Sequence, residues 1–158
     1  MFADNTYLEN ARKAILESSD TSSVYIGCDS QRKYNGKDRG WNAVYAVAII
    51  IHRDSKHGCQ IFGTKETMRD FGNLRQRLMN EVMYAVNASM EIIDVIGERN
   101  FEIHLDINTD NNYKSAIAVK EALGYVRGTL GVEPKLKPDS FASTHCADMI
   151  CNGKWDRG

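Results

Sequence analysis

Four acidic residues occur in segments that otherwise have the apolar pattern of buried structure. They are Asp29, Glu81, Asp106 and Asp148. Carboxylates that converge without basic partners repel one another, so their closeness is tolerated when divalent cations lie between them. Ligation by oxygen alone favours Mg²⁺ or Mn²⁺ over zinc. Such a group could perform metal-dependent hydrolysis, in which the metal activates a water molecule.

Two of these acids come at the ends of predicted strands. Asp29 ends a run of β-branched and aromatic residues, and strand alternation places it on the face of Tyr25. Asp106 ends a later strand and shares a face with His104. A cap or turn former is the alternative explanation for an aspartate at a strand end. Asp110 is a competitor for Asp106, although a role as the N-cap of the next helix explains Asp110 well.

The other two acids lie on predicted helices. The neighbours of Glu81 at helical spacing are apolar, and a buried glutamate is rare unless it is paired or bound to metal. Alternatively, Glu81 flanks the apolar stripe and reaches solvent. Asp148 lies one turn after His145 in the last helix, where a solvated helix acid is the alternative.

The elements that carry these acids predict one α/β domain over residues 1–158, with an extra N-terminal helix within 1–20. We expect a mixed five-stranded sheet, in which three antiparallel strands are followed by βαβ crossovers, with helices on both faces. The strands are predicted over residues 24–29, 41–52, 60–67, 101–107 and 132–137, and the helices over 7–16, 73–96, 112–126 and 141–151. The segment 31–40 is predicted as a loop.

The composition is that of an ordinary globular protein, with 42% hydrophobic and 26% charged residues. The net charge of −1 disfavours a protein that coats nucleic acid through bulk electrostatics, so contacts with phosphate must be local. The longest apolar run, residues 43–51, is too short to span a bilayer. No secretory signal is visible, and we expect a cytoplasmic protein without membrane contact.

The four cysteines do not form a C-x-x-C pair. A zinc site with a histidine such as His52, His57 or His145 is conceivable, but the usual ligand spacing is missing. Reduced and mostly buried thiols fit a cytosolic protein better.

Several short motifs resemble those of the ribonuclease H-like YkuK proteins. They are GCDSQ at residues 27–31, HLDIN at 104–108, KS at 114–115 and KPDSFASTHCADMICNGK at 137–154. The resemblance covers nearly the whole chain and implies a ribonuclease H-like fold. It also implies the D–E–D–D metal site of the wider superfamily, carried onto Asp29, Glu81, Asp106 and Asp148. No motif surrounds Glu81, and Cys28 replaces the small hydroxyl residue usual in the family, a change that we expect to affect packing more than metal binding.

The mechanism that we predict is two-metal hydrolysis of phosphodiesters by a nuclease. Asp29 would bridge the two Mg²⁺ or Mn²⁺ ions, with Glu81 and Asp106 completing the shell of one ion and Asp148 that of the other. His145 is a candidate for proton transfer or product release, although a helix histidine that fills a gap is an alternative.

By superfamily analogy, the expected substrate is the RNA strand of an RNA–DNA hybrid. The segment 31–41 is the candidate contact, through Gln31, Arg32 and Lys33 together with Lys37 and Arg39, unless it is an ordinary solvated hairpin loop. Lys114 could contact a phosphate or be a solvated surface lysine.

Two other functions remain open. One is a resolvase of Holliday junctions or other branched DNA, which would form a stable dimer. The sequence does not predict the oligomeric state. A non-catalytic nucleic-acid-binding or protein-binding module would have kept the fold and lost turnover.

Overall fold

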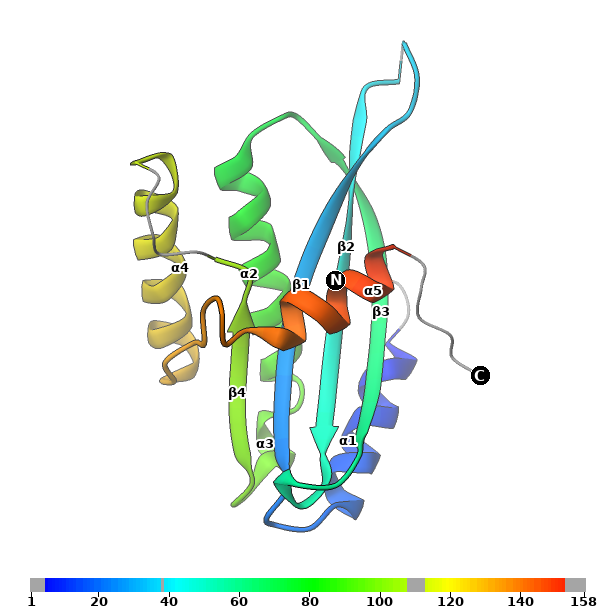
Figure 1. The fold of residues 1–158 in the computed structure, drawn as a ribbon, viewed down its shortest axis with the longest axis vertical. Coiled ribbons are helices and arrows are strands. Elements are labelled where there is room, and N and C mark those ends of the chain that lie inside the picture. Colours follow the sequence, from blue (N-terminus) through cyan, green and yellow to red (C-terminus); the bar gives the residue numbers. More distant parts are fainter. Residues whose placement is uncertain (1–4, 38, 108–112, 153–158) are drawn as a thin grey trace.

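The computed structural model describes residues 5–37, 39–107 and 113–152, and its centre is a mixed four-stranded sheet. The strands are β1 (Ser23–Tyr34), β2 (Trp41–His52), β3 (Cys59–Asp70) and β4 (Asn100–Leu105). Their order in the sheet is β3-β2-β1-β4. The first three strands form an antiparallel meander, and β4 runs parallel to β1. Figure 1 shows the β1–β2 hairpin projecting beyond the rest of the sheet.

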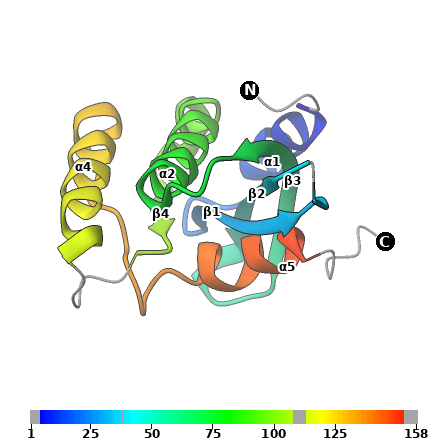
Figure 2. The ribbon, with the colours of Figure 1, turned by 90° about the horizontal axis from the view of Figure 1, so that it is seen from above.

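The sheet separates two layers of helices, which confirms the expectation of helices on both faces (Figure 2). One layer contains α1 (Thr6–Glu17), α2 (Leu74–Met90) and α4 (Tyr113–Leu130), and the short α3 (Ile93–Ile96) follows α2. The other layer is a π-helical segment, η2 (Ala142–Ala147), which continues into α5 (Asp148–Cys151). Each layer covers its own hydrophobic cluster.

Strand β2 supplies apolar side chains to both clusters, because all residues from Ala43 to Ile51 are buried. A strand covered on both faces has such a continuous apolar run. Strand β1 alternates instead: Ile26 and Cys28 belong to the cluster under α1 and α2, whereas Tyr25 packs against the cluster under η2 and α5. Asp29 therefore faces the η2–α5 layer, as the strand alternation predicted.

The approach of α5 to the sheet depends on Gly63 in β3. A Cβ atom at this position would lie 2.6 Å from the carbonyl oxygen of Val47 and would also clash with the side chain of Ile150 on α5. Such contacts essentially never occur, so only glycine allows α5 to pack this closely. The close packing positions Asp148, the first residue of α5, over β1.

The predicted fifth strand is wrong: the sheet of the described residues has four strands. The segment 132–137 does lie along the free edge of β4, but it forms only an isolated parallel bridge between His104 and Lys135. Two backbone hydrogen bonds flank the bridge, from Lys135 to Ile103 and from Leu105 to Lys135. One more backbone hydrogen bond joins Lys137 to Ile107 beyond the end of β4, and Pro134 and Pro138 lack the amide hydrogen that a longer ladder requires.

Several predicted boundaries also shift. The helix predicted over 73–96 is divided into α2 and α3, and the helix predicted to end at Val126 continues through Gly128 and ends before Gly131. The predicted loop 31–40 begins as strand, because β1 extends to Tyr34 and pairs there with Trp41. Among the described residues, none of the helices has the length and apolar character required to cross a membrane.

Candidate metal centre

The candidate site is built around Asp29, near the middle of the sheet. Strand β1 lies between β2 and β4, and the neighbouring Cys28 pairs with Leu105, the last residue of β4. Because the two strands are parallel, the chain leaves β4 beside Asp29 and places Asp106 next to it. The side chain of Asp29 is held in a confined position, since the residue is only 7% exposed.

Asp29 contacts two further carboxyl groups. Burial and then the charge of Asp106 raise the pKa of Asp29 to about 8; the Ser30 amide lowers it, and hydrogen bonding with Asp148 and Asp106 adds smaller increases. Three of the four predicted acids, Asp29, Asp106 and Asp148, therefore form one cluster, which we call the aspartate cluster. The mutual repulsion within this cluster is what a bound cation would relieve.

Glu81 reaches the same region from the other helical layer. It lies on α2, is 7% exposed, and accepts a hydrogen bond of 3.0 Å from the Ser30 hydroxyl. Burial and then the charge of Asp29 raise the pKa of Glu81 well above its ordinary value, although the Ser30 hydrogen bond and the charge of Arg77 act in the opposite direction. The apolar stripe of the sequence thus contains a buried glutamate, and the alternative of a solvent-exposed side chain is wrong.

Two amide side chains orient Asp148. Its Oδ1 accepts hydrogen bonds from Gln31 Nε2 at 3.2 Å and from Asn152 Nδ2 at 3.1 Å. The wider π-helical turn of η2 immediately precedes Asp148, and such turns frequently occur at functional sites. Gln31 on β1 and Asn152 after α5 therefore hold the same oxygen of this carboxylate.

One lysine competes with any cation in the aspartate cluster. Lys137 Nζ lies 2.7 Å from Asp106 Oδ1, and the contact with Asp106 raises the pKa of the lysine. Asp106 Oδ1 is nevertheless buried without a hydrogen bond of acceptable geometry, so we treat this contact as an ion pair with poor direction. The other three predicted acids have no such close ion pair with a described basic residue.

As the side chains stand, the described residues contain no group of three or more His, Cys, Asp or Glu side chains already arranged to hold a metal ion. The donor set nevertheless fits a divalent cation. The carboxylates are oxygen ligands, the buried Oδ1 of Asp106 has the Lys137 ammonium as its partner in place of a hydrogen bond, and Asp29 and Glu81 are both difficult to ionise without a nearby positive charge. Displacement of the partly exposed Lys137 would release Asp106 for ligation.

The cysteines take no part in a described metal group. All four are free; Cys28 and Cys151 are buried, Cys146 is half-buried and Cys59 is exposed. The thiol of Cys151 donates to the backbone carbonyl of Asp29 at 3.2 Å, so it holds β1 against α5. Cys28 packs in the cluster under α1 and α2, which agrees with the expected role in packing.

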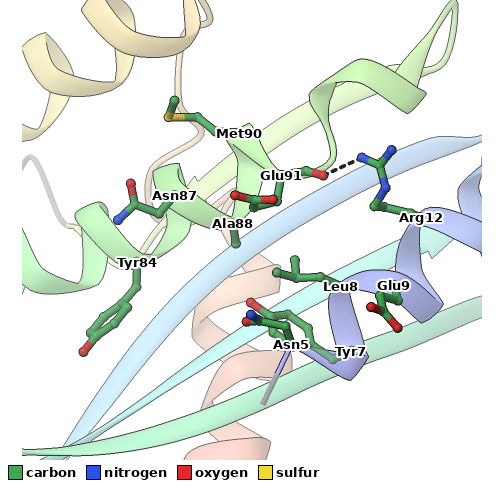
Figure 3. Close-up of a pocket in the computed structure, with 10 residues that line it drawn as sticks. All are labelled: Asn5, Tyr7, Leu8, Glu9, Arg12, Tyr84, Asn87, Ala88, Met90 and Glu91. Atoms are coloured by element: carbon green, nitrogen blue, oxygen red, sulfur yellow. Dashed lines mark hydrogen bonds between the residues drawn. The ribbon is translucent and has the colours of Figure 1, made fainter. Parts of the chain in front are cut away.

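A separate cavity of about 470 Å³ lies between α1 and α2 (Figure 3). Its lining includes Glu9, Arg12 and Glu91, and Arg12 donates to the backbone carbonyl of Glu91 at 2.7 Å. None of the four predicted acids lines this cavity. It is therefore a different feature from the candidate metal centre.

The remaining predicted site residues have varied positions. Gln31 belongs to the aspartate cluster through Asp148, whereas Arg32 pairs with Asp70 on the other face of the sheet. Lys33 and His145 are exposed. The side chain of Lys114 and the whole of Asp110 lie outside the described residues.

Sequence reasoning missed three residues that contact the acids: Ser30, Lys137 and Asn152. Ser30 could have been found, because strand alternation turns the residue after Asp29 toward the helix that carries Glu81. Lys137 had no comparable signal, since its position depends on how residues 132–137 run along the edge of β4.

The comparison with protein families gave a match over most of the chain. The family model described as Ribonuclease H-like matches residues 7–152 and so covers most of the chain. The search of curated proteins gave no significant match, and neither did the search of solved structures. The matched range contains all four predicted acids.

Proposed function

The chain belongs to the ribonuclease H-like family, and we propose from this premise that it is a divalent-metal-dependent endonuclease that hydrolyses nucleic-acid phosphodiesters. Membership of the family indicates a nuclease or another function related to nucleic acid. The dependence on metal, the mode of cutting and the substrate are parts of our proposal.

The observation that carries the proposal is the direct contact of Asp29 with Asp106 and Asp148, together with the buried Glu81 nearby. These residues come from β1, from the segments after β4 and η2, and from α2, so the fold gathers them from distant parts of the chain. Keeping several acids together without cations destabilises a protein. A function that needs the acids together accounts for that cost.

In the proposed site, Asp29 would be the shared ligand, because it interacts with both Asp106 and Asp148. Glu81 and Asp106 would hold one Mg²⁺ or Mn²⁺ ion with it, and Asp148 would hold the other. Such ions lower the pKa of a water molecule and stabilise the leaving oxygen. Gln31 keeps Asp148 oriented, and Ser30 keeps Glu81 turned toward the site. Lys137, once released from Asp106, would be free to contact a phosphate.

We further propose that the substrate is the RNA strand of an RNA–DNA hybrid and that the chain is of the YkuK type. Support for the narrower family comes from the motifs GCDSQ and HLDIN, which surround Asp29 and Asp106. The hybrid substrate is inferred from family analogy.

The decisive experiment is a cleavage panel with Mg²⁺ or Mn²⁺ over hybrid, single-stranded, duplex and four-way-junction substrates. We expect cleavage of the hybrid, and its loss in Asp29→Asn and Asp106→Asn. Asp94→Asn is the matched control, because this carboxylate is exposed and pairs with Arg12 far from the cluster. Wild-type rates in both cluster variants would refute the metal site, whereas preferential junction cleavage by a stable dimer would identify a resolvase.

A further inference from the structure

Three large aromatic side chains are exposed near the tip of the β1–β2 hairpin. Tyr34 is 51% exposed, Trp41 is 40% exposed and Phe71 is 87% exposed. Tyr34 pairs with Trp41 across the hairpin, and Trp41 pairs with Asp70, the residue before Phe71. We call these three residues the aromatic platform. Figure 1 shows the hairpin ends of β1 and β2 projecting beyond α2, whereas β3 ends at the loop that leads into α2.

Ion pairs and ring contacts hold the platform in place. The Arg32 guanidinium lies 4.3 Å from the ring centroid of Trp41, and the rings of Tyr34 and Trp41 are 5.1 Å apart. Asp70, whose side chain is only 5% exposed, pairs with Arg32 at 2.6 Å and with Arg77 at 3.2 Å. The ion pairs of Asp70 with Arg32 and Arg77 therefore support the exposed rings, which do not lie on a free loop.

The charge around the platform differs from that of the whole chain. Residues 31–41 and 69–77 contain seven basic and two acidic residues, although the whole chain has a net charge of −1. One basic residue, Arg69, lies with its guanidinium 6.0 Å from the ring centroid of Phe71. Exposed rings beside cations suit a polyanion that has flat apolar faces, which is the chemistry of a nucleic acid with unpaired bases.

We propose that the aromatic platform binds the unpaired bases of a single-stranded nucleic-acid segment, by stacking on its rings with arginines at the backbone. Paired bases in a duplex hide their faces, so the platform distinguishes a single strand or an overhang from a blunt duplex. As part of a nuclease, this inference rests on the proposed function and specifies its substrate: nucleic acid with a single-stranded extension beside the cleaved region.

The platform and the aspartate cluster lie on opposite faces of the sheet, because side chains alternate along β1 and Arg32, whose guanidinium lies over Trp41, is on the face of α2. Tyr34 lies five residues beyond Asp29 on the same strand, and at about 3.3 Å per residue the separation is roughly 17 Å. A stacked strand with a spacing of about 3.4 Å would cover this distance in roughly five nucleotides. Because the strand must also pass from one face of the sheet to the other, we expect that an extension longer than about five nucleotides is needed to reach from the platform to the site of cleavage.

The test is fluorescence anisotropy of the full chain in EDTA, which measures binding without cleavage. The probes are a labelled DNA strand, the same sequence as RNA, and a blunt hybrid of that sequence. Tyr34→Ala, Trp41→Ala and Phe71→Ala should each weaken binding of the single strands by about 5- to 100-fold, with less than about a twofold change for the blunt hybrid. None of these variants alters a charge, so electrostatic loss cannot produce the effect.

Tyr125→Ala is the matched control, because Tyr125 is an exposed tyrosine on α4 outside the platform. It should bind like the wild type, and Trp41→Phe should retain most of the single-strand affinity. Phe71→Ala also guards against misfolding, because Phe71 is the most exposed of the three rings. Equal losses for single strands and hybrid, or no loss at all, would overturn the proposal.

Sedimentation of the same variants separates a further outcome. If oligonucleotide affinity is unchanged but the variants lose a self-association that the wild type shows, the platform is a protein interface and the proposal is wrong. Because binding is measured without metal, the result does not depend on catalysis. Cleavage that survives Asp29→Asn would refute the proposed function and leave the platform result standing.

Discussion

Replacement of Asp29 by asparagine should stabilise the metal-free protein while abolishing its cleavage activity. Asparagine has nearly the same shape as aspartate but carries no charge. In the folded chain Asp29 is buried and in contact with Asp106 and Asp148. The substitution therefore removes a carboxyl that must take up a proton or carry a repulsive charge when the chain folds, and it opens no cavity. It also removes the ligand that we expect to be shared by the metals.

The magnitude follows from the pKa of Asp29, which rises from 3.8 to about 8 in the folded protein. At pH 7 the Asp29 carboxyl is ionised in the unfolded chain and largely protonated in the folded one. Folding therefore has to protonate a group about three pH units above its ordinary pKa, and at about 1.4 kcal/mol per unit the stabilisation by Asp29→Asn has an upper limit of about 4 kcal/mol. Structural relaxation and sharing of the proton within the cluster reduce this value. We expect about 2 kcal/mol, or about 4–8 °C in Tm for a chain of this size.

The sign of the pH dependence can be tested by differential scanning calorimetry in EDTA. Between about pH 4 and about pH 8 the folded state retains a proton on Asp29 that the unfolded state has already lost. The free energy of unfolding of the wild type should therefore fall as pH rises through this window and become flat above it. The Asp29→Asn variant should lose most of this slope, so the two Tm values should diverge from pH 5 to pH 8. Mg²⁺ or Mn²⁺ should raise the Tm of the wild type more than that of the variant.

The control is Asp94→Asn. Hydrogen bonding from Arg12 lowers the pKa of Asp94, so neutralising this carboxylate should not stabilise the protein. A wild-type Tm that stays constant from pH 5 to pH 8, or a metal-free Asp29→Asn variant less stable than the wild type, would refute the reasoning on repulsion.

Three other substitutions probe the residues around the acids. Gln31→Ala removes a donor to Asp148 and should weaken Mn²⁺ binding about 10-fold in calorimetric titrations, as loss of supporting residues commonly does; unchanged affinity would show that Gln31 does not orient this ligand. Lys137→Met removes the ammonium group that competes with metal for Asp106, so it should tighten Mn²⁺ binding. The free energy of unfolding should change by no more than about 1 kcal/mol, because the ion pair is partly exposed. Weaker Mn²⁺ binding would show that Lys137 does not compete with the metal. Ser30→Ala removes the hydroxyl that donates a hydrogen bond to the buried Glu81 carboxyl, so it should lower the free energy of unfolding in denaturant by about 1–2 kcal/mol. No change would mean that the Glu81 carboxyl is protonated and satisfied elsewhere.

Much of the fold could be predicted from sequence because its elements have strong local patterns. The apolar run of β2 and the period of α1 fix both elements nearly to their ends. The alternation in β1 also gave the correct face for Asp29. These features depend on residues close together in the chain, and local periodicity is sufficient to detect them.

What could not be predicted depends on contacts between distant segments. β1 extends to Tyr34 because its polar end pairs with Trp41 on β2, although the residues alone are typical of a loop. Lys137 reaches Asp106 because its segment follows the edge of β4 for a single bridge. Neither the pairing partner nor the length of pairing is encoded in a local pattern.

Lys137 also explains how the fold can keep its acids together without metal. An ammonium group 2.7 Å from Asp106 supplies one positive charge to the aspartate cluster. A single charge cannot compensate Asp29 as well, whose pKa remains raised to about 8. The metal-free protein thus tolerates the cluster with one lysine and a retained proton, and a divalent cation would replace both. Binding of metal should therefore release a proton, so the measured affinity for Mn²⁺ should increase with pH up to about 8.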